Sequence, residues 1–298
     1  MSVPNDISLR QDLEENLERL AAQRALYSRA KAVRGASVLV VTLLAIGSLP
    51  VAIYWPKASA ALGLFALLWT LVELVLLDGL EEQNRQKAAL IQEDFDTRVF
   101  GLPWNPALGV RPIPEAIVDA GKPAKGDPIL KGWYADAGPL PRALAVLASQ
   151  RSCVAWDHRA RHLYQFLLAS IALVLVVAAV ALALATNQSL SSFLVGFAVP
   201  LMPALQHTIK TFKAHRRAGA EQERFIEELS STWEEGVTNG GAIPDAKLRL
   251  VQDRLLLLRR EQTPVPDYLY RWLRSRYEAA MREATQRLVS EAVARLAR

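Results

Sequence analysis

Glu73 is an acidic residue inside a long apolar run, and it is the first candidate for chemistry in this sequence. A carboxylate within a membrane span is costly and usually faces protein or water. Glu73 is therefore a candidate for a role in a pore or between subunits. Asp78 follows about one helical turn later, so the alternative is a residue that merely marks the membrane interface. The sequence leaves both interpretations open.

Residues that could bind a metal or catalyse a reaction form no recognisable set. His158 and His162 are four apart, as zinc ligands on a helix can be, but Arg159 and Arg161 flank them and no third ligand is evident. The sequence lacks a glycine-rich phosphate loop, a Gly-x-Ser-x-Gly motif and a Cys-x-x-Cys motif. We therefore expect no metal site, no catalytic residues, no enzymatic activity and no cofactor. The single cysteine, Cys153, excludes an intrachain disulfide and fits a reducing compartment.

Pro200 and Pro203 lie in the last long apolar run. Each proline removes a backbone hydrogen bond, so this run should be bent or loosened. A hinge used in opening and a static kink both fit this pattern.

The overall composition is that of a membrane protein with sizeable polar parts. Of the 298 residues, 51% are apolar and only 22% are charged, and the charged residues are segregated from long uncharged runs. A net charge of +5 and a pI near 9.4 would suit a nucleic-acid binder or a protein on an anionic membrane. The uncharged runs favour the membrane, and we expect no DNA or RNA polymer as a partner.

Four segments have the length and composition of membrane spans. A span needs about 20 mostly apolar residues, because a helix rises ~1.5 Å per residue across ~30 Å of hydrocarbon. Residues 36–55 and 58–77 form a first predicted hairpin, and the second follows within residues 163–209, which contain no Asp, Glu, Lys or Arg. The polar residues 186–189 divide that run into spans 164–185 and 190–209. The sequence thus predicts an all-α integral membrane protein with four transmembrane helices in two hairpins.

Basic residues predict the orientation of the hairpins. The two hairpin tips carry only Lys57, whereas basic residues gather at the other ends of the spans: Arg24, Arg29, Lys31 and Arg34; Arg151, Arg159 and Arg161; and Lys210, Lys213, Arg216 and Arg217. Basic residues stay on the cytoplasmic side. We therefore expect a multi-pass membrane protein whose N- and C-termini are cytoplasmic.

The remaining segments are predicted to form an α-helical cytoplasmic part. Residues 1–35 should be a helix that runs into the first span, and residues 210–298 should form further helices. The central segment, 78–163, begins as an extension of the second span and then becomes proline-rich, with eight of the sixteen prolines in residues 102–141. Prolines at this density exclude long helices there, while Trp104 and Trp133 favour an ordered segment. This central segment is the candidate sensor of a ligand.

The sequence resembles the bacterial SMODS-associated four-transmembrane (S-4TM) family of pore-forming effectors over nearly its whole length. The resemblance rests on short matches in the same order: Arg10-Gln11, Ala22-Gln23, Leu26-Tyr27-Ser28 and Ala30-Lys31; Glu93-Asp94-Phe95-Asp96 followed by Leu102-Pro103-Trp104-Asn105; Trp133-Tyr134, Gln150-Arg151, Trp156-Asp157, Arg159 and Tyr164; and Val265-Pro266-Asp267-Tyr268-Leu269-Tyr270. The central pair of motifs is the most distinctive. Cys153 departs from the small or polar residue expected there.

This resemblance implies a role in cyclic-oligonucleotide-based antiphage signalling (CBASS). There, a cGAS/DncV-like nucleotidyltransferase makes a cyclic nucleotide after infection. The effector would bind this cyclic di- or trinucleotide and permeabilise the inner membrane, causing abortive infection. Four spans in one subunit leave little room for an aqueous path, so the pore would form in a homo-oligomer, with a tetramer as one arrangement. The lipid bilayer, further copies of the chain and the nucleotide are thus the expected partners.

If the resemblance holds, a cyclic nucleotide needs aromatic planes for its bases, Arg or Lys for its phosphates and amides for its base edges. Eight residues between 104 and 156 supply this set: Trp104, Asn105, Arg111, Trp133, Tyr134, Gln150, Arg151 and Trp156. The alternative is that the tryptophans pack a small core and that Arg151 pairs with a carboxylate such as Asp157. Other functions also stay open: a channel or transporter subunit with cytoplasmic regulatory helices, or a scaffold that recruits partners through its C-terminal helices.

Overall fold

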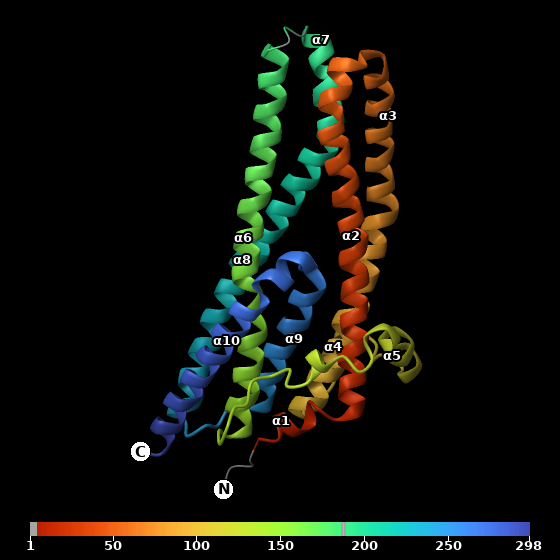
Figure 1. The fold of residues 1–298 in the computed structure, drawn as a ribbon. Coiled ribbons are helices and arrows are strands. Elements are labelled where there is room, and N and C mark those ends of the chain that lie inside the picture. The colour runs from red at the N-terminus through yellow and green to blue at the C-terminus, as the bar shows by residue number, and fades with distance from the viewer. Residues whose placement is uncertain (1–4, 186, 188) are drawn as a thin grey trace. The chain divides into compact units, whose positions relative to one another are not determined.

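The computed structural model describes the backbone of residues 5–185, 187 and 189–298, with the side chains of residues 56, 156–160, 197, 267, 268, 270, 271 and 273–278 excepted. The regular elements among the described residues are all helices (Figure 1). The chain divides into two compact units. Unit 1 comprises Met1–Arg29, Asn84–Ala160 and Ala218–Arg298, and unit 2 comprises Ala30–Gln83 and Arg161–Arg217.

The helices of the first half confirm that the N-terminal helix continues into a span. The short helix α1 (Ile7–Arg10) precedes α2 (Glu14–Tyr54), which runs without a break through the predicted first span. Only Trp55 separates α2 from α3 (Pro56–Val72), because Pro56 fits the first turn of a helix but cannot continue one. A π-helical stretch, η1 (Glu73–Leu77), joins α3 to α4 (Asp78–Phe100).

The proline-rich segment is ordered and contains only short elements, as predicted. These are η2 (Pro106–Leu108), α5 (Pro114–Gly121), η3 (Lys122–Ala124) and η4 (Pro128–Leu130). Asn105 and Asp127 cap two of them, each accepting a hydrogen bond from the backbone N–H two residues later. A proline follows each cap, where its missing N–H costs nothing.

The second half has longer helices than the sequence indicated. The helix α6 (Arg142–Ala185) leads into the third span, and α7 (Leu190–Phe193) and the π-helical η5 (Leu194–Ala198) precede α8 (Val199–Thr238). The predicted separate helix after the fourth span is thus a continuation of α8. Gly240 and Gly241, both at positive φ, end it, as C-terminal glycines commonly do. The helices α9 (Asp245–Glu261) and α10 (Asp267–Leu296) follow.

By length and apolar composition, three described helices can cross a membrane. Leu190–Gly196 and Val199–Thr238 meet at a bend of 56° and make a fourth candidate when the bent pair is counted as one span. This agrees with the four predicted transmembrane helices. The expected bend in the fourth lies just before Pro200 and after the π-helical turn η5. Leu64, Val75 and Leu173 are among the large apolar side chains exposed on the spans, as side chains that face lipid are.

Each unit has its own core. Unit 1 buries large side chains from α2, α4, α6, α8 and α9, among them Leu20, Phe95, Leu147, Phe225 and Leu248. Each such side chain contributes about 1.5–3 kcal/mol by burial. Unit 2 has a core of Val41, Ala45, Ala52, Ala179, Leu201 and Ala204. Its alanines allow close helix approach, which is how helices associate in lipid.

Candidate functional site

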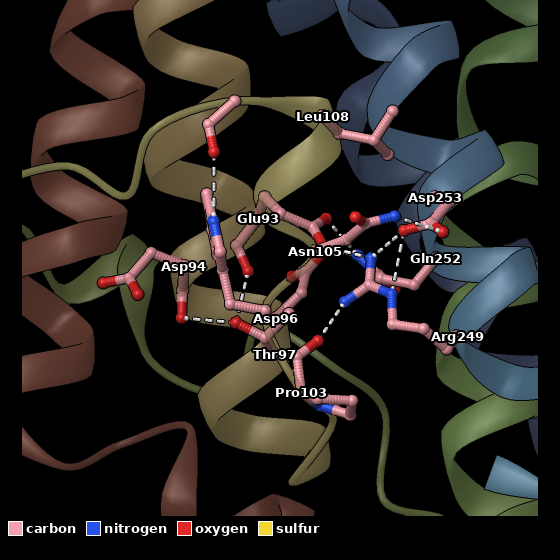
Figure 2. A network of polar contacts seen from close by, with 12 residues as sticks. Glu93, Asp94, Asp96, Thr97, Pro103, Asn105, Leu108, Arg249, Gln252 and Asp253 are labelled. Carbon is pink, nitrogen blue, oxygen red and sulfur yellow. Dashed lines mark hydrogen bonds and ion pairs between the residues drawn. The ribbon is translucent and has the colours of Figure 1, made fainter. Parts of the chain in front are cut away.

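The distinctive acidic motif, residues 93–96, lies near the end of α4 and forms a buried polar network in unit 1 (Figure 2). Its three carboxylates point to different partners. Asp94 accepts hydrogen bonds from Arg19 on α2 at 2.6 Å and from Arg111 at 2.5 Å, with Arg98 at 3.3 Å. Burial alone would raise the pKa of Asp94, but these arginines hold it below its ordinary value. Asp94 is therefore an anion shared by three cations.

Glu93 and Asp96 contact α9. Glu93 pairs with Arg249 and accepts a hydrogen bond from Gln252 at 2.8 Å. Gln252 also donates to Asp96 at 2.9 Å, so one amide group bridges both carboxylates. Burial and the Asp96 carboxylate raise the pKa of Glu93 to about 7, against the opposing effects of Arg249 and Gln252. Glu93 is thus poised to gain or lose a proton near neutral pH.

Asp96 is fully buried and organises a second cluster. Arg259 lies 2.5 Å from one carboxylate oxygen, and the Tyr134 hydroxyl donates to the other at 2.5 Å. Burial would lower the pKa of Arg259, but the Asp96 carboxylate raises it well above its ordinary value. The Cys153 thiol lies 3.5 Å from Arg259 and 3.8 Å from the Tyr134 hydroxyl, and burial raises its pKa. A raised pKa disfavours the thiolate, which is the reactive form of cysteine.

The loop after the acidic motif is fastened to α9. Arg249 donates to the Pro103 carbonyl at 2.8 Å, and Asn105 donates to Asp253 at 2.9 Å. Within the loop, Trp104 Nε1 donates to the Gly109 carbonyl at 3.1 Å. Figure 2 shows Arg249 between Glu93, Asp253 and Pro103. The two central motifs thus form one structure, in which α9 holds both.

Two of the predicted ligand residues are buried inside this network. Tyr134 is buried, with its hydroxyl on Asp96. Gln150 is fully buried and donates to the Leu248 carbonyl at 3.0 Å and to Gln252 at 3.1 Å. A ligand would reach these two side chains only if the network opened.

Other predicted ligand residues are accessible. The Arg111 guanidinium lies 5.6 Å from the Trp104 ring centre, in a cation–π arrangement, and 45% of the Arg111 side chain is exposed. Arg151 is half-buried on α6, and burial lowers the pKa of its guanidinium. Trp133 is partly buried and packs against the core of unit 1. Among the described residues, no hydrogen bond, ion pair or ring contact joins Trp133 or Arg151 to the rest of the predicted set. The side chain of Trp156 lies outside the described residues.

The residues predicted to act in the spans lie in unit 2. Glu73 begins the π-helical stretch η1. Its Oε1 atom lies 2.7 Å from His207 Nδ1, within hydrogen-bond distance. Pro200 and Pro203 lie in the first turns of α8, next to the bend.

In the part of the chain with described side chains, no group of three His, Cys, Asp or Glu residues could hold a metal ion. His158, one of the predicted histidine pair, lies outside those residues.

The sequence did not reveal the partners of these residues. Arg249, Gln252 and Arg259 recur at spacings of three and seven along α9, the spacing of one helical face. That signal marks a polar face but does not identify what the face contacts. His207 likewise gave no sign of its contact with Glu73, since 134 residues separate them.

Comparisons with known proteins agree with the fold. The SMODS-associating 4TM effector domain family matches residues 5–288. A protein of Bacillus cereus (strain VD146), described as a probable CBASS effector molecule, is 26% identical over 274 residues, which cover 89% of this chain and 92% of that protein. No solved structure matches the chain.

Proposed function

Because this chain belongs to the SMODS-associating 4TM effector family, we propose that it is an antiphage defence effector of CBASS. In this proposal unit 1 is cytoplasmic and binds a cyclic di- or trinucleotide, and unit 2 oligomerises in the inner membrane and permeabilises it. The observation that carries the proposal is the family match over residues 5–288, which includes both the spans and the networked unit. The relative's description as a CBASS effector supports the same role.

The arginine content of unit 1 supports an anionic ligand. Asp94 is shared by Arg19, Arg98 and Arg111, so two arginines would still balance its charge if Arg111 turned to a phosphate. Arg111 already lies beside the Trp104 ring, and an arginine next to an aromatic plane suits a nucleotide, whose base stacks while its phosphate pairs. Arg151 is a further candidate, because its guanidinium is half-buried and its pKa is lowered by burial alone. We place the nucleotide at Trp104 and Arg111, with Arg151 as a further phosphate contact.

Direct binding to the full-length, detergent-solubilised protein tests this site. A panel of cyclic di- and trinucleotides of adenine and guanine serves as the probe. Arg111→Ala, Arg151→Ala and Trp104→Ala should each weaken binding by about ten-fold or more, since a charge-assisted hydrogen bond or a stacked base contributes ~1–3 kcal/mol. Arg287→Ala is the matched control, because Arg287 is exposed and pairs with Glu283 on its own helix. Unchanged affinity in all three variants would place the nucleotide elsewhere.

Expression in cells tests the proposed role. With a cyclic-nucleotide-producing partner enzyme, the chain should stop growth and collapse the membrane potential; without it, cells should grow normally. Constitutive permeability independent of the enzyme would favour a conventional channel. A cysteine introduced at Lys57 should react with an impermeant thiol reagent from outside, whereas Cys153 should not; labelling of Cys153 in intact cells would reverse the proposed orientation.

A further inference from the structure

One face of α8 contacts four other helical segments of unit 2. Its polar residues are spaced three, one and four apart, and each contacts a different helical segment. His207 contacts Glu73 in η1 at 2.7 Å, Lys210 pairs with Asp78 at the start of α4, Thr211 accepts from Arg34 of α2 at 2.7 Å, and His215 contacts Arg161 of α6 at 3.0 Å. The spans are therefore held together by polar contacts that share α8.

Two of these contacts involve a carboxylate, and the contact between Glu73 and His207 is the more buried of the two. The exposed fractions of the two side chains are 14% and 4%. A carboxylate in a span that lost its partner would have to find water or another polar group, because solvation in hydrocarbon is so poor. The π-helical turn that begins at Glu73 adds to the case, since such turns inside helices are frequent at functional sites.

A small cavity lies beside this contact. Its volume is about 10 Å³, and its lining includes Arg34, Ser37 and Glu73. A space of this size is close to the minimum that holds one water molecule. On the other side of the contact, His207 Nε2 is buried without a hydrogen-bond partner among the described residues. The Glu73 side of the contact therefore borders a cavity with polar lining residues, and water would reach the carboxylate from that side.

We propose that His207 is the latch that keeps the membrane unit closed, and that Glu73, once His207 withdraws, makes the open path select cations. This inference rests on the proposed permeabilising function. While the latch holds, His207 retains the carboxylate inside the unit. Once released, the carboxylate draws in water and cations, because an unpaired anion there must be hydrated or neutralised.

Movement of α8 offers a way to release the latch. Beyond Arg217 the same helix continues to Thr238 and supplies Phe225 and Leu229 to the core of unit 1. A helix is a stiff element, so a shift of α8 moves His207 relative to Glu73. The bend before Pro200 gives α8 freedom to shift without moving α7.

Ion flux from vesicles containing the full-length protein, without any nucleotide, tests the latch. His207→Ala should raise the resting K⁺ leak at least ten-fold over wild type, because breaking a buried pair by removing one partner is strongly unfavourable. His207→Asn should restore a low leak, since its amide nitrogen can take the place of Nδ1. Gln206→Ala is the matched control, being exposed and adjacent on the same helix, and should leak as wild type does.

Reversal potentials in a KCl gradient test the selectivity. The His207→Ala leak should prefer K⁺ to Cl⁻, and Glu73→Gln added to His207→Ala should remove that preference. A folded His207→Ala protein with a wild-type resting leak, or equal leaks in His207→Ala and His207→Asn, would overturn the latch. An unchanged K⁺ preference in the double variant would overturn the role of Glu73. Because no nucleotide is added, these outcomes are separate from failure of the proposed signalling function.

Discussion

The two units of this protein are stabilised in opposite ways. Unit 1 buries Leu and Phe side chains and surrounds them with charged residues that pair across helices, such as Asp96 with Arg259. Unit 2 has a core of small residues and places its apolar side chains outward, with its polar contacts gathered on one face of α8. In water, large apolar side chains stabilise a core; in lipid they do not, and close packing and a few polar contacts take their place. The arrangement of the helices in unit 1 is therefore fixed by many buried contacts. In unit 2, a change in helix arrangement costs less free energy, because fewer such contacts must break.

Among the changes that test this difference between the units, loss of the Asp96 carboxylate should lower the free energy of unfolding most. Asp96→Ala leaves the buried Arg259 without its anion, and breaking a buried pair in this way costs about 3–5 kcal/mol. Denaturant unfolding of the detergent-solubilised protein should show this loss, and Cys153 should become reactive to thiol reagents as the cluster around it opens. Glu283→Ala, which removes an exposed pair with Arg287, should cost less than about 1 kcal/mol. Equal effects of the two changes would mean that the network does not stabilise unit 1.

Glu93 should give unit 1 a pH dependence near neutral pH. Its pKa is about 7 in the folded protein and 4.5 ordinarily, so the folded state binds the proton more tightly. The resulting stability is fully present below about pH 4.5 and is lost as the pH rises through 7. Between pH 5.5 and 8 the free energy of unfolding should fall by about 2 kcal/mol on this account.

Glu93→Gln is the variant that isolates this effect. It should have a flatter pH profile than wild type over the same range, because the amide does not titrate. Asp94, whose pKa lies below its ordinary value, does not titrate in this range and leaves the comparison undisturbed. Parallel profiles for the two proteins would show that Glu93 does not titrate in this range.

Over-packing of unit 2 should have a smaller effect than loss of the Asp96 carboxylate. A Cβ at Gly196 would lie 2.9 Å from Ala52 Cβ, so Gly196→Val forces two helices apart. The expected destabilisation is about 1–3 kcal/mol, the usual cost of added volume in a packed core. Gly47→Val is the matched control, since nothing lies within 4 Å of a Cβ there. If both variants unfold alike, small-residue packing does not hold the spans together.

The sequence by itself determined that the chain is an all-α membrane protein with four spans. Their signal is local: a run of about 20 apolar residues has no other comfortable environment. It also determined that the proline-rich segment holds no long helix, because each proline restricts its own backbone. The helix continuing from the fourth span was harder to predict, since a change from apolar to charged residues alters the surroundings of a helix without ending it.

Only the tertiary structure decided which polar residues meet. Glu93 and Gln252 are 159 residues apart, and Glu73 and His207 are 134 apart. Periodicity reports which face of a helix a residue occupies, but the partner of that face depends on how helices pack. Tyr134 and Gln150 illustrate the limit: their types suit a ligand site, yet the fold buries both and uses their polar groups internally. A side chain's chemistry is fixed by its type, whereas its availability is fixed by the neighbours that folding brings to it.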